Sequence, residues 1–182
     1  MQQCVELAKK GLRKAMPNPS VGAIIVKNDQ IIGQGHTSPF GGPHAEIVAL
    51  ENAQGEDLSE ATLFVSLEPC SHHGKTPPCT EAIVASGIKK VVIGIQDPFA
   101  EVNGQGVETL RKAGIEVIED VLKDECYNVN RRFFTYHEKK RPYIILKWAQ
   151  TRDGFIDQIR EESRPSINWI SSLETKKLTH QW

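Results

Sequence analysis

Five short runs rich in β-branched residues alternate with helical segments, and this alternation limits the folds open to the chain. The predicted strands are residues 21–27, 30–35, 61–67, 90–95 and 115–120. The predicted helices are residues 43–53, 77–86, 106–114 and 121–137. Asn28-Asp29 lies between the first two strands and predicts a hairpin turn. Strands that alternate with helices indicate a layered α/β domain with a partly parallel sheet that begins with the hairpin.

The amino-terminal segment precedes this pattern. It reads MQQCVELAKKGLRKAMPNP and lacks the apolar core and the small-residue cleavage site of a secretory signal. Its basic residues also fit a transit peptide, but a short amphipathic helix ended by Pro17 and Pro19 is the simpler interpretation.

A second pattern begins in the last quarter of the chain. Residues 142–149 predict a strand, and Ser171 with Glu174 predicts a capping box that opens a helix. About forty residues with one clear strand cannot bury a core of their own. We therefore expect a first domain at residues 1–140 and the start of an incomplete second domain at residues 141–182.

Composition excludes several classes of function. The 182-residue chain has 22 Lys and Arg against 23 Asp and Glu, which gives a net charge of −1. A near-neutral protein has no overall attraction for nucleic acid or acidic membranes. No stretch approaches the roughly 18 apolar residues of a membrane span. Hydrophobic residues make up 39%, so we expect a soluble cytoplasmic protein without nucleic-acid or membrane partners.

Residues 68–79 read EPCSHHGKTPPC and contain two of the four cysteines, Cys70 and Cys79. A disulfide, a metal site and a pair of core thiols are the alternatives for these two residues. Stable disulfides are rare in a reducing cytosol, which weakens the first alternative. Cys4 and Cys126 lie on predicted helices without ligand-type neighbours, so we interpret both as packing residues.

The two cysteines have partners elsewhere that favour the metal site. His44 and Glu46 lie at the predicted start of one helix, and Cys79 lies at the start of another. One histidine and two cysteines supply three ligands that Zn²⁺ prefers and leave the fourth position open, as in a catalytic site. Residues two apart point about 200° apart on a helix flank, so His44 and Glu46 can share a site only off the helix end. Glu46 is then free to take a proton from zinc-bound water.

His44-Ala45-Glu46, Pro69-Cys70 and the later Cys79 resemble the signature of the zinc-dependent cytidine deaminase superfamily, H-x-E followed by P-C-x-x-C. Eight residues rather than two separate the cysteines of this chain. The resemblance implies a three-layer α/β/α sandwich around a mixed sheet. It also implies zinc bound by His44, Cys70 and Cys79, with Glu46 as the proton shuttle.

The longer insertion, together with residues 17–26 and 41–46, resembles one branch of that superfamily. This branch is the deaminase domain of the bifunctional deaminase/reductase family of riboflavin biosynthesis, and the resemblance covers roughly residues 1–140. Residues 141–154 and 168–171 resemble the start of the family's reductase domain, which implies the first elements of a dihydrofolate-reductase-like fold.

This second resemblance implies a substrate and its contacts. The reaction would be hydrolytic deamination of 2,5-diamino-6-(5-phosphoribosylamino)pyrimidin-4-one. Asn18, His72 and Lys75 would contact the substrate. In the intact protein, Ala149 and Trp169 would approach NADPH, which reduces the ribose of the product to ribitol. Members of the superfamily self-associate, so the resemblance also implies a homo-oligomer.

The chain departs from the family pattern at three places. Relatives often have a substrate-side histidine seven positions before the zinc histidine, whereas this chain has Thr37 there and its histidine at His36. Relatives read D-P-N-P after the strand at residues 90–95, and here Phe99 replaces the phosphate-side asparagine. Ile167 stands where a substrate serine is expected in the reductase domain.

Other interpretations stay open at this point. A nucleoside or tRNA deaminase would need the short Cys-x-x-Cys and, for RNA, a basic face. A non-catalytic zinc module would need a fourth protein ligand, which His72 or His73 could supply. Polar side chains are common in exposed loops and turns, so Asn18, His72 and Lys75 also fit a role without substrate.

Overall fold

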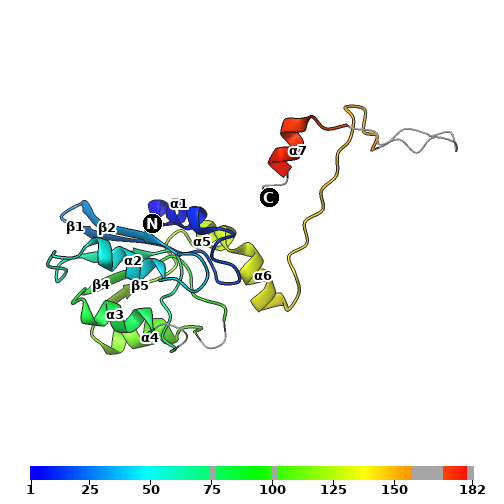
Figure 1. The fold of residues 1–182 in the computed structure, drawn as a ribbon. Helices are drawn as coiled ribbons and strands as arrows, with labels where there is room; N and C mark the ends of the chain where they lie inside the picture. The colour runs from blue at the N-terminus through cyan, green and yellow to red at the C-terminus, as the bar shows by residue number, and fades with distance from the viewer. Residues whose placement is uncertain (74–76, 100–101, 157–169, 180–182) are drawn as a thin grey trace, which may run out of the picture. The chain divides into compact units, whose positions relative to one another are not determined.

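The computed structural model describes residues 1–73, 77–99, 102–156 and 170–179 (Figure 1). The chain divides into two compact units, Met1–Tyr143 and Ile144–Trp182. The residues predicted to bind the metal lie in the first unit, which contains a single mixed sheet.

The sheet has the strand order β2-β1-β3-β4-β5. Its strands are β1 (Gly22–Lys27), β2 (Gln30–His36), β3 (Thr62–Val65), β4 (Lys90–Ile93) and β5 (Glu116–Ile118). β1 pairs antiparallel with β2 and β3, whereas β3, β4 and β5 run parallel. Asn28 and Asp29 have φ angles of 50° and 61°, as a tight hairpin requires. The predicted hairpin and partly parallel sheet are confirmed.

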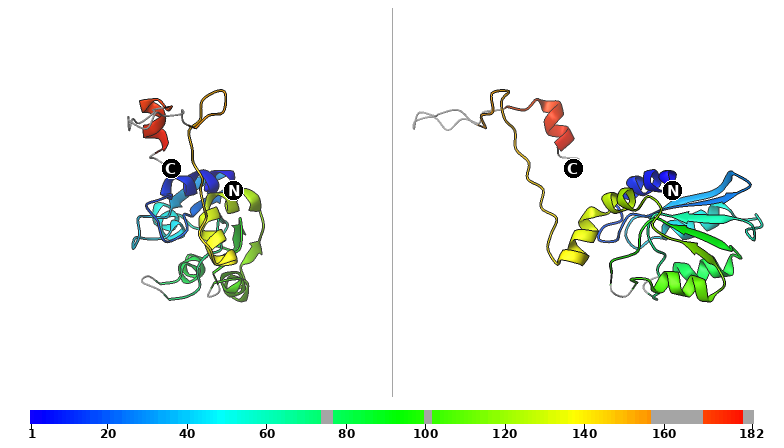
Figure 2. Two further views of the ribbon diagram at one scale, coloured as in Figure 1. Left: turned by 90° about the vertical axis from the view of Figure 1, so that its right-hand side faces the viewer. Right: turned by 180° about the vertical axis from the view of Figure 1, so that it is seen from behind.

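Helices cover both faces of this sheet (Figure 1 and Figure 2). On one face lie α1 (Gln2–Gly11) and α5 (Lys123–Val129). On the other face lie α2 (Ala45–Asn52), α3 (Cys79–Ala85) and α4 (Gln105–Lys112). Buried Ile24 of β1 packs with Cys4 and Leu7 of α1, whereas Ile25 belongs to the larger core cluster of the first unit. Neighbouring residues of a strand thus fill two apolar layers, and the three-layer prediction is confirmed.

Helix α2 lies directly on β2 because two glycines remove the side chains between them. A Cβ atom on Gly35 would lie 2.8 Å from the backbone nitrogen of Ala49 and 2.8 Å from Cβ of Val48. Gly33 has an equally close approach to Ala53, whose Cβ would lie 2.9 Å away. These contacts fix the height of α2 above the sheet, and with it the position of the residues at the start of the helix.

The predicted helix at residues 121–137 is two helices, α5 and α6 (Arg131–Lys139), which meet at Asn130. The buried Asn130 amide accepts a hydrogen bond from the backbone nitrogen of Ser20 and donates one to the backbone oxygen of Ser20. This contact ties the helix junction to the segment before β1. The same connection explains the break in the helix, because an asparagine bonded in this way favours a helix end.

The third predicted helix and the predicted C-terminal pattern also need corrections. Helix α3 begins at Cys79, later than expected, and Thr76 as its predicted N-cap lies outside the described residues. The predicted strand at residues 142–149 is wrong, since the described part of Ile144–Trp182 offers it no strand to pair with. The capping residue of α7 (Leu173–Thr179) is Ser172 and not Ser171, because Ser172 Oγ accepts from the Thr175 backbone nitrogen.

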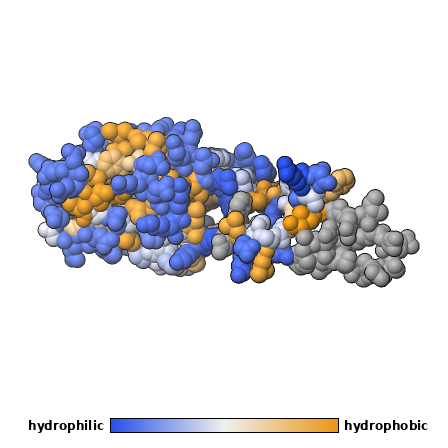
Figure 3. Space-filling model, turned by 90° about the horizontal axis from the view of Figure 1, so that it is seen from above, coloured by the Kyte–Doolittle hydropathy of each residue, from blue (hydrophilic) through white to orange (hydrophobic). Residues whose placement is uncertain are grey.

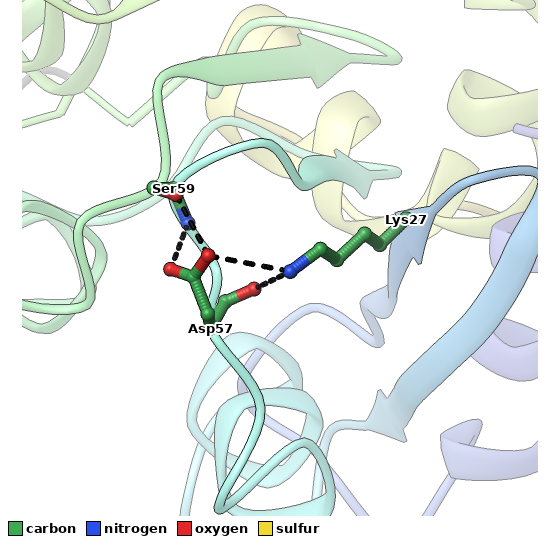
Figure 4. Close-up of polar contacts among 3 residues, drawn as sticks. All are labelled: Lys27, Asp57 and Ser59. Atoms are coloured by element: carbon green, nitrogen blue, oxygen red, sulfur yellow. Dashed lines mark hydrogen bonds and ion pairs between the residues drawn. The ribbon is translucent and has the colours of Figure 1, made fainter.

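A polar contact holds the loop before β3 to the hairpin (Figure 4). Lys27 Nζ donates to the backbone oxygen of Asp57 at 2.6 Å and to its carboxylate at 3.4 Å. The Asp57 carboxylate also accepts from the backbone nitrogen and the hydroxyl of Ser59. The contact therefore couples the end of β1 to the approach of its neighbour β3.

The outer surface of the first unit is largely hydrophilic in the view of Figure 3, where hydrophobic residues form separate patches. Within the described part of the chain, none of the helices combines the length and the apolar character that a membrane crossing requires.

Candidate metal centre

Three element ends converge at the centre. His44 is the N-cap of α2 in extended conformation, and Glu46 lies in the first turn of that helix. Cys70 follows the end of β3, and Cys79 is the first residue of α3. The two helix starts therefore face the end of a central strand. Each ligand is held by an element that is itself anchored in the core.

The three side chains that sequence reasoning assigned to zinc lie together. His44 Nδ1, Cys70 Sγ and Cys79 Sγ all lie within 4.8 Å of one another. His44 Nδ1 is 3.5 Å from Cys70 Sγ and 3.3 Å from Cys79 Sγ. A tetrahedral Zn²⁺ with bonds of about 2.0 Å to nitrogen and about 2.3 Å to sulfur places its ligand atoms roughly 3.6 Å apart. The donor types and their spacing therefore fit zinc.

The cysteines are free thiols, so the disulfide alternative for Cys70 and Cys79 is wrong. Cys79 is buried, and its backbone nitrogen donates to Cys70 Sγ at 3.3 Å. Hydrogen bonds from Cys79 and His44 lower the pKa of the Cys70 thiol below its ordinary value. The thiolate is the form of cysteine that binds a metal, and a lowered pKa favours the thiolate. Cys4 and Cys126 are also buried but pack in the core, as predicted.

Glu46 is beside this cluster and is almost fully enclosed, with 3% of its surface exposed. Burial is the largest influence on its carboxyl group and, with the negative charge of Cys70, raises its pKa to about 7. Such a carboxyl group can both accept and release a proton near neutral pH. Glu46 is not among the clustered ligand atoms, which leaves it available for proton transfer.

The centre opens into a cavity of about 460 Å³. His44, Glu46, Cys70 and Asp97 line it together with residues from the loops around β1, β3 and β4 and from α6. Polar groups near the ligands and a wide apolar remainder are typical of a small-molecule site.

Two of the predicted substrate contacts lie on this cavity. Asn18 and His72 both line it, whereas Lys75 lies outside the described residues. Nδ1 of His72 and Oγ of Ser71 are buried and have no hydrogen-bond partner among the described residues. Unpaired buried polar atoms are costly, so Nδ1 of His72, which lines the cavity, is suited to receive a ligand.

The family departures can also be located. Thr37 lines the cavity, but its hydroxyl oxygen accepts from the Val21 backbone nitrogen at 2.8 Å and so supports the fold. Phe99 lines the cavity as well, and its ring centroid is 6.2 Å from that of His72 and 5.3 Å from that of His137. An aromatic wall thus stands where relatives have an asparagine.

The fourth-ligand alternative gains nothing from the geometry. Nε2 of His73 lies 3.1 Å from a carboxylate oxygen of Glu81, and both side chains are exposed. Among the described residues, the cluster of ligand atoms has no member beyond His44, Cys70 and Cys79. The arrangement is that of a three-ligand site facing a cavity.

Sequence reasoning did not assign a role to two buried carboxyl groups near the centre. Asp97 lines the cavity, and burial raises its pKa to about 6. Glu68 lies two residues before Cys70 and is 3% exposed. Both are charged residues that follow an apolar strand. Exposed loops normally begin at such positions, so little in the sequence predicts their burial. Phe133 and His137 of α6 also line the cavity, and no local pattern marks them.

The predicted NADPH contacts belong to the second unit. Ala149 is half-buried there, whereas Trp169 and Ile167 lie outside the described residues.

Residues 1–95 match the sequence model of the cytidine and deoxycytidylate deaminase zinc-binding region. Over 180 residues the chain is 49% identical to the riboflavin biosynthesis protein RibD of Aquifex aeolicus, which covers 99% of this chain and 49% of the relative. It is 40% identical over 177 residues to RibD of Escherichia coli, covering 97% of this chain and 47% of the relative. The chain thus spans about half the length of these curated relatives.

Solved structures give the same picture. A crystal structure of a diaminohydroxyphosphoribosylaminopyrimidine deaminase/5-amino-6-(5-phosphoribosylamino)uracil reductase from Thermotoga maritima is 51% identical, with a TM-score of 0.88. The match covers 100% of this chain and 51% of that chain. Acinetobacter baumannii RibD is 43% identical with a TM-score of 0.89, and the match covers 100% of this chain and 49% of that chain. The fold is shared with both.

Proposed function

The chain belongs to the family with a cytidine and deoxycytidylate deaminase zinc-binding region, and from this premise we propose that it deaminates a pyrimidine in riboflavin biosynthesis. The substrate is 2,5-diamino-6-(5-phosphoribosylamino)pyrimidin-4-one, and water replaces its exocyclic amine. The names of the similar proteins from Aquifex aeolicus and Thermotoga maritima support this choice of pathway and substrate.

One observation carries the proposal. Three zinc-type ligand atoms cluster beside a cavity that His44 and Cys70 line, and an enclosed carboxylate, Glu46, lies next to them without joining the cluster. A structural zinc site has four protein ligands and no use for a neighbouring carboxylate. A hydrolytic site needs an open position and a group that moves protons.

In the proposed mechanism His44, Cys70 and Cys79 hold the zinc. When bound, zinc supplies a Lewis acid that makes water nucleophilic near neutral pH. The Glu46 carboxylate takes a proton from the attacking water and gives it to the nitrogen of the leaving amine. A carbon–oxygen bond forms at the ring carbon, the carbon–nitrogen bond breaks, and ammonia leaves. Burial of Glu46 keeps this proton away from bulk solvent.

The remaining assignments concern binding and the intact protein. We propose that Asn18, His72 and Lys75 contact the substrate, since the first two line the cavity. We also propose that residues 1–140 form the deaminase domain and that residues 141–182 begin a reductase domain, in which Ala149 and Trp169 approach NADPH. A cytoplasmic homo-oligomer without nucleic-acid or membrane partners completes the proposal.

The test is ammonia release from the diaminopyrimidine ribotide by the wild type and by Glu46→Gln, with bound zinc assayed in both. The variant should keep its zinc and lose activity by on the order of a hundredfold or more, because general acid–base catalysis is removed. Glu51→Gln is the matched control, since Glu51 lies on the same helix and is exposed. A wild type that binds zinc but releases no ammonia from the ribotide or from cytidine contradicts the deaminase proposal.

A further inference from the structure

Glu68 is a buried carboxylate in the segment that connects β3 to Cys70. Backbone N–H groups use all of its capacity to accept hydrogen bonds. Its Oε2 accepts from the backbone nitrogens of Asp97 at 3.1 Å and Gly104 at 3.0 Å. Its Oε1 accepts from those of Gly106 at 2.9 Å and Val107 at 3.2 Å. Four N–H groups on one carboxylate satisfy the usual lone-pair capacity of an ionised acid.

Three of these donors belong to the start of one helix. Gly104 is the N-cap of α4, and Gly106 and Val107 lie in its first turn. The first N–H groups of a helix have no partner within the helix, and a negative charge there is favourable. Glu68 therefore caps α4 from a neighbouring segment of the chain. No side chain of α4 or of its N-cap performs this function.

The contact brings two backbones together without intervening side chains. A Cβ atom on Gly106 would lie 3.0 Å from Oε1 of Glu68 and in closer overlap with the backbone oxygen of Pro69. The start of α4 consequently lies against the Glu68-Pro69-Cys70 segment. A side chain added at Gly106 would therefore have to move α4 away from this segment.

The donors also belong to a segment that forms one side of the cavity. We call residues 97–99 and 102–107 the wall segment. Asp97, Phe99 and Val102 of this segment line the cavity, and so does Glu68 itself. One side chain thus connects the segment that carries Cys70 to the wall segment of the cavity.

We propose that Glu68 is a positioning residue for the deamination, which sets the distance between the wall segment and the metal centre. This inference rests on the proposed function for its substrate. It requires a carboxylate at position 68, because both oxygens act only as acceptors. An amide of the same shape has one acceptor oxygen, and its NH₂ group would face two N–H donors.

Glu68→Gln tests the proposal in the zinc-loaded chain. We expect the KM for the diaminopyrimidine ribotide to rise on the order of tenfold, since small misplacements of a binding wall are costly. Zinc content should stay at the wild-type level and kcat should change less than KM. A KM within twofold of the wild-type value overturns the proposal.

Two further variants separate positioning from stability. Leu110→Ala removes a buried side chain from the same helix α4 and lowers the melting temperature without touching Glu68. It should leave KM unchanged, and an equal rise in KM at an equal loss of melting temperature overturns the proposal. Gly106→Ala pushes α4 from Pro69 and leaves the carboxylate intact, so it should raise KM as Glu68→Gln does.

A measurement on the wild type decides the matter even where these variants fail to fold. The backbone amides of Asp97, Gly104, Gly106 and Val107 should exchange hydrogen slowly, although they lie in a loop and in a first helical turn. Exchange as fast as that of an unfolded peptide of the same sequence means that the carboxylate does not hold them. This readout needs no substrate, so it stands apart from failure of the proposed deamination.

Discussion

Gly35→Ala should displace the proposed metal ligand His44 and the proposed proton carrier Glu46, although Gly35 lies on β2 and outside the cavity lining. The new Cβ atom would lie 2.8 Å from the backbone nitrogen of Ala49, whereas an ordinary contact begins at 3.4 Å. This contact alone requires helix α2 to move by about 0.6 Å (3.4 − 2.8 Å), and the backbone oxygen of Ala45 lies closer still to the new Cβ atom, so the full displacement is larger.

The displacement reaches the site because α2 is short and begins there. His44 is its N-cap and Glu46 lies in its first turn, so both shift when the helix moves as a unit. A misplacement of around 1 Å can lower an enzymatic rate on the order of a hundredfold, and we expect a loss of about ten- to a hundredfold here. Overpacking also costs about 1–3 kcal/mol of folding free energy, or about 3–10 °C in melting temperature.

The assay combines ammonia release, zinc content and thermal unfolding of the purified variant. Gln34→Ala is the control, because Gln34 is the neighbouring residue on β2 and its side chain is exposed. It should retain wild-type activity and melting temperature. Wild-type activity in Gly35→Ala would show that the sheet accommodates the extra methyl group without moving His44 and Glu46, and it would refute the argument from close contact.

Two further predictions concern buried polar groups. Burial raises the pKa of Asp97 from 3.8 to about 6 in the folded chain. The folded state therefore binds this proton more tightly, which gives stability below pH 4 that is lost as the pH rises through 6. Asp97→Asn should flatten the melting temperature against pH over this window, and an unchanged slope would contradict the assignment. Asn130→Ala leaves the Ser20 backbone nitrogen and oxygen without their partner and should cost about 3 kcal/mol. Urea unfolding measures the loss, and a cost under 0.5 kcal/mol, the scale of surface changes, would contradict it.

Features encoded by neighbouring residues could be predicted from the sequence. Asn28 and Asp29 form the hairpin turn because both tolerate positive φ angles, and alternating apolar runs form the strands on either side. The structure also brings His44, Cys70 and Cys79 together. The sequence motif predicted this, because it places these residues at two helix starts and after a strand end. Site residues at the ends of helices and strands can be predicted from the sequence, because proline, glycine and polar residues mark where those elements begin and end.

Features that depend on distant partners could not be predicted. The helix break at Asn130 is stabilised by Ser20, which is 110 residues away in the sequence. Residues 142–149 have the composition of a strand, but a strand forms only where another can pair with it. Helix periodicity and β-propensity describe local preference, and neither contains the identity of a distant partner.

The cavity is lined both by residues that the sequence motif predicts and by residues that distant contacts position. His44, Glu46 and Cys70 in its lining belong to the motif recognised in the sequence. The wall segment is instead held by backbone N–H groups, 29 to 39 positions after Glu68, that donate hydrogen bonds to the Glu68 carboxylate. The Glu68-Pro69-Cys70 segment contributes to both, since Cys70 is a proposed metal ligand and Glu68 accepts the hydrogen bonds of the wall segment. A change at Cys70 therefore acts on metal binding, and a change at Glu68 acts on the fit of the substrate. Comparing zinc content with KM in the two variants separates these effects within three residues of sequence.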